Sequence, residues 1–313
     1  MTRKKSTNGS TKEKITISID NIVLDNIDKE IKVHKTYPNR SVAIESLVRS
    51  ALPRMEKAVL LLTGHDLLFK DEQLDLCVVE VENLVRGGVH EVDIFFNSHS
   101  AEFVWTQLAP KLQQLQERVG RRALSFELVP DESTRGDAAV LVGEHRDTPL
   151  CLVHGTMIRG KSLEEKLDVD KVFQFHRANK CGLTLVLGDV RQRDPSVVGI
   201  ARTEEEEQPS FGTVRMEGSA VVEIIPPNDP RPSTSFADLG FYIIEPTILE
   251  YIHDYSQKYN SDESIISFTH PRAEGEKSII GRLLAEGHRV SGYVYAGKWY
   301  HLRRFATGAD KKS

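Results

Sequence analysis

From Ala58 onward, the chain alternates between short apolar runs and longer segments with helical periodicity. The first run, residues 58–62, is apolar at every position, which is typical of a strand covered on both faces of a sheet. This alternation predicts an α/β protein with a mostly parallel sheet and helices on both of its faces. The expected strands are 58–62, 91–96, 125–129, 150–154, 183–187, 211–216, 220–225 and 239–244, and the expected helices are 76–87, 101–118 and 170–179.

The first fifty-odd residues follow another pattern, which predicts one strand and two helices. Isoleucine alternates with polar residues over 15–19, as in a strand with a single apolar face. Asp20 or Asn21 is expected to cap a helix that begins near Ile22, and Ser41 to cap a second helix. Apolar residues recur at helical spacing at Val23, Leu24, Ile27 and Ile31, and again at Ala43, Ile44, Leu47, Val48, Ala51 and Leu52.

About forty residues of this kind are too few to enclose a hydrophobic core. Two copies can enclose one if they pair their strands and interlock their helices. We therefore expect a homodimer built around a two-stranded antiparallel ribbon, with a polar ribbon face that fits the major groove of double-stranded DNA.

The charge of the chain is divided unevenly, which favours a polyanionic partner for its front part. The chain has 41 Lys+Arg and 46 Asp+Glu, yet residues 1–57 hold 12 basic against 7 acidic side chains. These residues lack the bulky apolar face of a membrane-surface helix, so DNA is the expected partner and no membrane partner is expected. The expected DNA contacts are Lys14, Thr16, Ser18, Lys35, Asn39, Arg40, Ser41, Arg3, Lys4 and Lys5.

Residues 14–52 resemble the ribbon-helix-helix family of transcriptional regulators. The resemblance lies in the alternating strand, the Asn39-Arg40-Ser41 entry into the second helix and the apolar stripe of that helix. It implies an intertwined dimer with its ribbon in the DNA groove. A dimerisation module without a DNA function remains the alternative.

From Ala58 to Leu302 the chain resembles the sugar-phosphate nucleotidyltransferases, enzymes that join a nucleoside triphosphate to a sugar phosphate. The resemblance implies a Rossmann-like mixed sheet with a nucleotide site at the carboxyl ends of its strands. The segments that carry it are 58–62, 85–92, 135–139, 152–156, 173–177, 235–242 and 292–301.

The positions that carry the chemistry of this family differ here. Residues 63–68 read Thr-Gly-His-Asp-Leu-Leu where the family has roughly Gly-Gly-x-Gly-Thr-Arg. Thr156 and His301 stand where the family has its two metal-binding carboxylates, and neither is a favoured magnesium ligand. The family's sugar-phosphate lysine is absent near 224–226. These departures predict that the domain has lost its activity and is not an enzyme.

The ligand site is nevertheless expected to persist, because the strand ends of such a sheet bind ligands whether or not catalysis remains. No metal or cofactor is expected, and a nucleotide or sugar nucleotide is the expected effector. The expected lining is Thr63, Gly64, Arg135, Gly136, Asp137, His154, Thr156, Asp238 and His301.

Together, these features predict a sequence-specific DNA-binding transcriptional regulator whose larger, inactive domain senses a nucleotide or supports oligomerisation. Two alternatives stay open. One is an active or altered sugar-phosphate nucleotidyltransferase that uses its N-terminal module for dimerisation or autoregulation. The other is a DNA-organising or partition protein.

The expected divisions are a disordered basic arm (1–13), the ribbon-helix-helix module (14–53), the larger domain (58–303) and a disordered tail (304–313). Cys77, Cys151 and Cys181 are scattered and odd in number, which predicts buried free thiols in a reducing compartment. No apolar run is long enough to span a membrane, and no apolar segment follows the basic N-terminus. A cytoplasmic location is therefore expected.

Overall fold

The computed structural model describes residues 20–29, 31–32, 39–44, 56–62, 71–120, 123–131, 138–142, 144, 147–155, 157–160, 162–192, 213–225, 235–258, 268 and 278–301. The chain divides into two units, Met1–Pro53 and Arg54–Ser313, and each is described by itself. None of the helices in these residues is long and apolar enough to cross a membrane.

The N-terminal unit contains α1 (Asn21–Lys29), whose start agrees with the sequence prediction. The amide of Ile22 donates a hydrogen bond to Asp20 Oδ1 at 2.7 Å, so Asp20 supplies the cap. The buried side chain of α1 is Ile27. The predicted strand at 15–19 lies outside the described residues.

A second helical stretch begins at Arg40, and the prediction that Ser41 caps it is wrong. The amide of Val42 donates to Asn39 Oδ1 at 3.0 Å, and the amide of Ala43 donates to the Asn39 carbonyl at 3.0 Å. Asn39 is therefore the cap, because its side chain accepts a hydrogen bond from a free amide in the first turn. Ser41 cannot be the cap, since it already lies within the helix.

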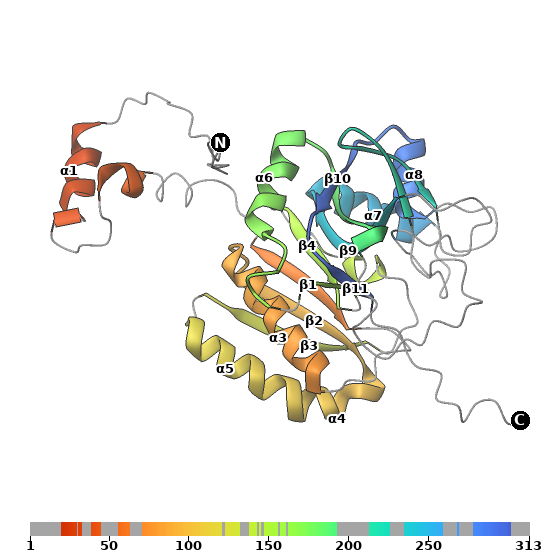
Figure 1. The fold of residues 1–313 in the computed structure, drawn as a ribbon, viewed down its shortest axis with the longest axis horizontal. Coiled ribbons are helices and arrows are strands. Elements are labelled where there is room, and N and C mark those ends of the chain that lie inside the picture. The colour runs from red at the N-terminus through yellow and green to blue at the C-terminus, as the bar shows by residue number, and fades with distance from the viewer. Residues whose placement is uncertain are drawn as a thin grey trace, which may run out of the picture. The chain divides into compact units, whose positions relative to one another are not determined.

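The larger unit is built on a nine-stranded sheet with the order β3-β2-β1-β4-β9-β6-β10-β8-β7 (Figure 1). Parallel pairing joins β1 to β2 and β4, β2 to β3, and β6 to β10, whereas β9 runs antiparallel between β4 and β6. The predicted mixed α/β fold is thus confirmed for this unit, whereas the expectation of a mostly parallel sheet is wrong, because β7, β8 and β9 add antiparallel pairings. The strands are β1 (Lys57–Leu62), β2 (Glu91–Asn97), β3 (Ser125–Asp131), β4 (Leu150–His154), β6 (Leu183–Asp189), β7 (Thr213–Glu217), β8 (Ala220–Ile225), β9 (Phe236–Ile244) and β10 (Val290–Tyr295).

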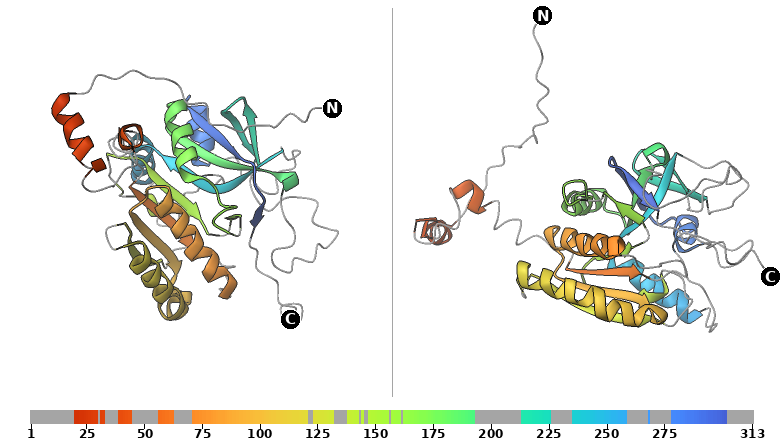
Figure 2. Two further views of the ribbon diagram at one scale, coloured as in Figure 1. Left: turned by 60° about the vertical axis from the view of Figure 1, so that its left-hand side comes forward. Right: turned by 60° about the horizontal axis from the view of Figure 1, so that its bottom comes forward.

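Two helical layers enclose this sheet, as the apolar run in β1 predicts. All six residues of β1 are buried, and the five that follow Lys57 alternate between two hydrophobic clusters. Leu60 packs in the cluster of α3, α5 and α6, while Leu61 packs in the cluster of α7 and α8. Figure 2 shows α3 and α5 side by side on their face. The helices are α3 (Asp71–Arg86), α4 (Ala101–Phe103), α5 (Ala109–Val119), α6 (Val169–Asn179), α7 (Pro246–Lys258) and α8 (Ile279–Ala285).

The structure departs from the predicted elements in several ways. The expected helix over 101–118 contains a π-helical turn at Val104–Leu108, just before Pro110. Proline has no amide hydrogen, so the regular bonding of an α-helix cannot pass through it. The helices α7 and α8 are additions to the predicted set. So is a second, two-stranded sheet, in which β5 (Met157–Arg159) pairs with β11 (Trp299–His301).

Candidate ligand site at the carboxyl ends of the strands

The order of strands in the sheet reverses between β1 and β4. The chain builds β1, β2 and β3 outward in one direction and then places β4 on the other side of β1. In open α/β sheets, ligands bind outside the carboxyl ends of the strands at such a reversal. His154 pairs with Leu61 here, and the Gly155 amide donates to the Leu61 carbonyl at 2.8 Å. The ends of β1 and β4 therefore form the candidate ligand site.

Gly155 allows the ends of these two strands to approach closely. A Cβ atom at this position would lie 2.5 Å from Leu62 Cδ2 and 3.1 Å from the Leu61 carbonyl oxygen. A larger residue would require the Leu62 side chain to move and would crowd the Leu61 carbonyl. The glycine thus allows the close approach of the two strand ends.

The neighbouring strand β9 brings a carboxylate and a phenol to the same place. Gly240 has a φ of +60°, and a Cβ there would lie 2.7 Å from His154 Cβ. The Gly240 amide donates to Asp238 Oδ1 at 3.0 Å, and the Tyr242 hydroxyl donates to Asp238 Oδ2 at 2.5 Å. The Tyr242 ring meets the His154 ring edge-on at 5.8 Å between centroids and stacks on Phe268 at 4.7 Å.

These contacts hold the Asp238 carboxylate in one orientation. The residue is mostly buried, with 6% of its surface exposed. An imidazole, a carboxylate and a phenol together can accept and donate several hydrogen bonds, as recognition of a polar ligand requires.

The two-stranded sheet brings distant parts of the chain together beside β4. His301 on β11 pairs with Met157 on β5. A threonine hydroxyl and an imidazole do not match the carboxylate oxygens that magnesium prefers. The residue types at 156 and 301 therefore do not match the metal-binding carboxylates that the sequence resemblance implies. Across the described residues, no group of three or more His, Cys, Asp or Glu side chains could hold a metal ion.

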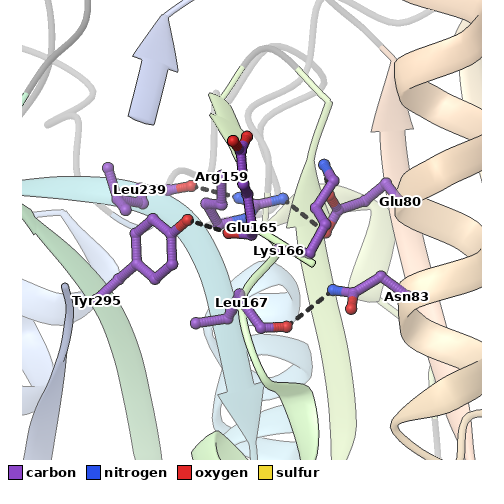
Figure 3. A network of polar contacts seen from close by, with 8 residues as sticks. All are labelled: Glu80, Asn83, Arg159, Glu165, Lys166, Leu167, Leu239 and Tyr295. Carbon is purple, nitrogen blue, oxygen red and sulfur yellow. Dashed lines mark hydrogen bonds and ion pairs between the residues drawn. The ribbon is translucent and has the colours of Figure 1, made fainter. Parts of the chain in front are cut away.

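A buried ionic network anchors this two-stranded sheet to the body (Figure 3). Arg159 on β5 is fully buried; its Nη1 donates to the Leu239 carbonyl at 2.7 Å, and its Nη2 donates to Glu80 Oε1 at 3.0 Å. Lys166 Nζ donates to the other oxygen of Glu80 at 2.6 Å. Phe241 lies under the guanidinium at 5.3 Å. One carboxylate on α3 thus fixes both β5 and the segment that follows it.

The ionisation of Glu80 depends on this pairing. Burial by itself would raise the pKa of Glu80, but the charges of Arg159 and Lys166 and their hydrogen bonds outweigh burial and lower the pKa to about 2. Glu80 is therefore ionised at neutral pH.

Further contacts extend this anchoring to both strands of the small sheet. The Tyr295 hydroxyl donates to the Glu165 carbonyl at 2.5 Å, and Asn83 Nδ2 donates to the Leu167 carbonyl at 3.0 Å (Figure 3). Trp299 Nε1 donates to the Asp189 carbonyl at 2.9 Å, which ties β11 to the end of β6. The backbone of β5 and β11 is therefore positioned by interior contacts.

The predicted site residues are only partly within the described residues. His154 and Asp238 lie at one edge of the sheet, as does the backbone of His301. Thr63, Gly64, Arg135, Gly136, Asp137 and Thr156 lie outside the described residues. Glu80, Arg159 and Lys166 were not predicted, because 79 and 86 positions separate Glu80 from its partners. The available signal was a charged residue on the apolar face of a helix, next to Val81.

Of the predicted DNA contacts, Asn39, Arg40 and Ser41 lie within the described residues. Asn39 is the helix cap. The guanidinium of Arg40 donates two hydrogen bonds of 2.5 Å to the carboxylate of Asp28, and this interaction lowers the pKa of Asp28. Lys14, Thr16, Ser18, Lys35, Arg3, Lys4 and Lys5 lie outside the described residues.

Solved structures show which fold this is, whereas no family model and no curated protein matches the chain. The inositol-1-phosphate CTP transferase from T. maritima is 11% identical with a TM-score of 0.52, over 80% of this chain and 90% of that chain. A UDP-glucose pyrophosphorylase complexed with UDP-glucose is 17% identical with a TM-score of 0.54, over 79% and 92%. An apo UDP-glucose pyrophosphorylase is 17% identical with a TM-score of 0.52, over 79% and 93%. The chain therefore has the fold of the sugar-phosphate nucleotidyltransferases.

This likeness contradicts two sequence predictions, namely a DNA-binding transcriptional regulator and a domain that is not an enzyme. The three structures are a transferase and two pyrophosphorylases, and none is a DNA-binding protein. The first prediction counted formal charges, yet Arg40 is already paired with Asp28. The prediction that the domain is not an enzyme rested on the residue types at 63–68 and 156 alone. It did not include the buried contacts that position Arg159 and Lys166.

Proposed function

We propose that the larger unit is an active nucleotidyltransferase with altered active-site chemistry. It would transfer a nucleotidyl group from a nucleoside triphosphate to a sugar phosphate and release pyrophosphate. The observation that supports this most is the pairing of β5 with β11, which places His301 opposite Met157. Hydrogen bonds donated by Arg159, Lys166 and Trp299 hold that arrangement.

Within this proposal, the residues around the ends of β1, β4 and β9 bind the nucleotide and the sugar phosphate. His154 is suited to donate a hydrogen bond to a phosphate oxygen, since an imidazole ring carries an N–H donor. Asp238 is suited to accept hydrogen bonds from ligand hydroxyls, since a carboxylate is an acceptor. The remaining proposed lining is Thr63, Gly64, Arg135, Gly136, Asp137, Thr156 and His301.

The test is an assay of pyrophosphate release by the full chain. Each of the common nucleoside triphosphates is combined with a panel of sugar phosphates, with magnesium, with manganese and with neither. Turnover with at least one pair is expected. If no pair is turned over and calorimetry detects no saturable nucleotide binding, the proposal is wrong.

A matched pair of variants shows whether turnover arises at the candidate site. Tyr242→Phe removes the hydroxyl that orients Asp238, and loss of one hydrogen bond is expected to lower kcat/KM about tenfold. Tyr251→Phe makes the same change on α7, where the hydroxyl donates to Glu286, and kcat/KM should not change. Equal effects of the two substitutions would place the activity elsewhere.

We also propose that the N-terminal unit is a ribbon-helix-helix module that pairs two copies of the chain. Three apolar side chains are exposed in its described part: Ile22 at 72%, Val23 at 46% and Val42 at 39%. The buried apolar residues there are Ile27 and Ala43, which is a small core for a unit that folds alone. A second copy would cover the exposed set and enlarge this core.

The mass of the full chain, measured by light scattering, tests the pairing. A dimer is expected, and Ile22→Lys should shift it toward monomer because a charge replaces an apolar contact. Asn21→Lys adds the same charge at the neighbouring exposed position of α1 and should leave the dimer intact. A monomeric parent chain would rule the pairing out.

A further inference from the structure

A second cluster of ionisable side chains lies at the amino end of β6. The candidate ligand site lies at the opposite ends of the strands. His176 on the last turn of α6 is 1% exposed, and Cys181 follows that helix and is 4% exposed. Thr184 on β6 and Glu245, which directly precedes α7, complete the cluster. The left-handed conformation of Lys180, with φ of 47°, turns the chain back so that Cys181 returns to His176.

The contacts order the cluster as carboxylate, imidazole and thiol. His176 Nε2 lies 2.8 Å from Glu245 Oε1, so Nε2–H donates to the carboxylate. Nδ1 on the other side of the ring is 2.9 Å from Thr184 Oγ1 and 3.6 Å from Cys181 Sγ. Cys181 Sγ is also 3.1 Å from Thr184 Oγ1. A base oriented by a third group beside a nucleophile is the arrangement that activates cysteine for reaction.

The three cysteines of the chain differ in how their surroundings change the pKa of the thiol. Burial raises the pKa of Cys77 to about 12 and raises the pKa of Cys151 well above its usual value. Burial also disfavours the Cys181 thiolate, but hydrogen bonds with His176, Ser291 and Thr184 outweigh it and lower the pKa of Cys181. Among the described residues, the ionisable groups that act on this thiol are His176 from α6 and, through its imidazole, Glu245.

The pairing also affects His176. Burial alone would lower the pKa of His176, but hydrogen bonds with Cys181 and Glu245 and their charges raise it. The imidazolium and the thiolate therefore stabilise each other. In this state the sulfur is nucleophilic and a proton lies within one contact of it.

We propose that Cys181 is a modification site that reacts with a small peroxide to give a sulfenic acid. The thiolate sulfur attacks one peroxide oxygen, an S–O bond forms and the O–O bond breaks. Sulfur is oxidised by two electrons and the peroxide is reduced to water or an alcohol. His176 supplies the proton that the leaving oxygen takes up. The reaction is independent of nucleotidyl transfer, because the cluster lies at the other edge of the sheet.

Access limits the reagent to a small molecule. Cys181 is buried to the same degree as Cys77, at 4% against 6% exposed. Its neighbour Lys180 is exposed, and the side chain of Glu245 is 35% exposed, so the cluster lies just below the surface. Cys77 is thus an internal control of similar solvent exposure, and no imidazole acts on the pKa of its thiol.

The test treats the native full chain with limiting hydrogen peroxide and traps sulfenic acid with a dimedone reagent. Mass spectrometry then compares the three cysteine peptides within one sample. Cys181 is expected to be labelled at least about tenfold faster than Cys77, since thiolate character controls the rate. Equal labelling of Cys181 and Cys77, or faster labelling of Cys77, overturns the proposal.

Two further measurements separate activation from simple exposure. The rate of Cys181 alkylation by iodoacetamide should rise with pH to a midpoint below 9.0, whereas Cys77 should show no midpoint below about 12. In Glu245→Gln, which keeps a polar partner for His176, the Cys181 midpoint should move upward. A midpoint at or above 9.0 in the parent chain, or one unchanged by Glu245→Gln, contradicts the proposed activation.

Discussion

The two edges of the main sheet hold their ionisable side chains in different ways. Near the carboxyl ends of the strands, Glu80 is paired with Arg159 and Lys166, and its pKa is lowered to about 2. At the amino end of β6, His176 and Cys181 interact with each other. The pKa of the His176 imidazole is raised and the pKa of the Cys181 thiol is lowered. The first network keeps one charge state over a wide pH range, and the second can change its protonation near neutral pH.

This difference follows from the types of partner. A guanidinium and an ammonium remain charged at all ordinary pH values, so a carboxylate between them always has two positively charged partners. Imidazole and thiol titrate close to neutrality, and burial opposes the charge of each. The first combination suits a network that holds β5 and β11 in place. The second suits a reactive group.

The largest effect is expected from Glu80→Ala, which would leave Arg159 and Lys166 buried without their carboxylate. The free energy of unfolding should fall by about 3–5 kcal/mol, as measured by urea denaturation. Glu82→Ala on the same helix is the control, since its partners Arg86 and Arg118 are both 60% exposed. Its loss should be about 1 kcal/mol or less. Equal losses in the two variants would show that the buried network does not anchor the sheet.

The acid sensitivity of the network provides the next test. The pKa of Glu80 in the folded chain lies below its usual 4.5, so its stabilisation is complete above pH 4.5 and is lost as the pH falls toward 2. The corresponding contribution is about 3 kcal/mol. The difference in free energy of unfolding between the parent chain and Glu80→Gln should therefore shrink across this window. A difference that does not change with pH would contradict the assigned pairing.

A smaller effect is expected where β9 passes His154. Gly240→Ala places a Cβ 2.7 Å from His154 Cβ, whereas Gly218→Ala has nothing within 4 Å. Both glycines have a φ near +60°, so both variants share the backbone strain. Gly240→Ala should cost about 2 kcal/mol more than Gly218→Ala because of crowding. Identical melting temperatures for the two variants would mean that His154 is not confined by β9.

The smallest effect is expected at the amino edge of the sheet. Thr184→Val keeps the side-chain volume but removes the hydroxyl that contacts both His176 and Cys181, and should lower the free energy of unfolding by about 1 kcal/mol. Thr184→Ser retains the hydroxyl and should restore the pH profile of Cys181 alkylation that the valine variant alters. If both variants show the parent profile, the hydroxyl has no part in tuning the thiol.

Local patterns predicted the strands of the larger unit well. The ranges 150–154 and 220–225 coincide with β4 and β8, because apolar strands bounded by turns are visible in sequence. The three buried free cysteines are also confirmed. The capping residue of the second helical stretch was not predictable in this way, since Asn39 and Ser41 are both favoured caps and geometry chose between them.

The candidate site was harder to predict than the strands. His154 and Asp238 are recognisable from their places at strand ends. The bulge at Gly240 that brings them together is a property of the pairing between strands. The short strands β5 and β11 have three residues each, which is too short for a periodic signal.

The sequence by itself determined the alternation of strands and helices and the burial of β1, because each depends on local periodicity and composition. Only the tertiary structure decided which charged residues meet. Glu80 finds Arg159 and Lys166, and His176 finds Glu245, across 69 or more positions of chain. Coulombic attraction and desolvation depend on distance in space and on burial, and neither quantity is written in the order of residues.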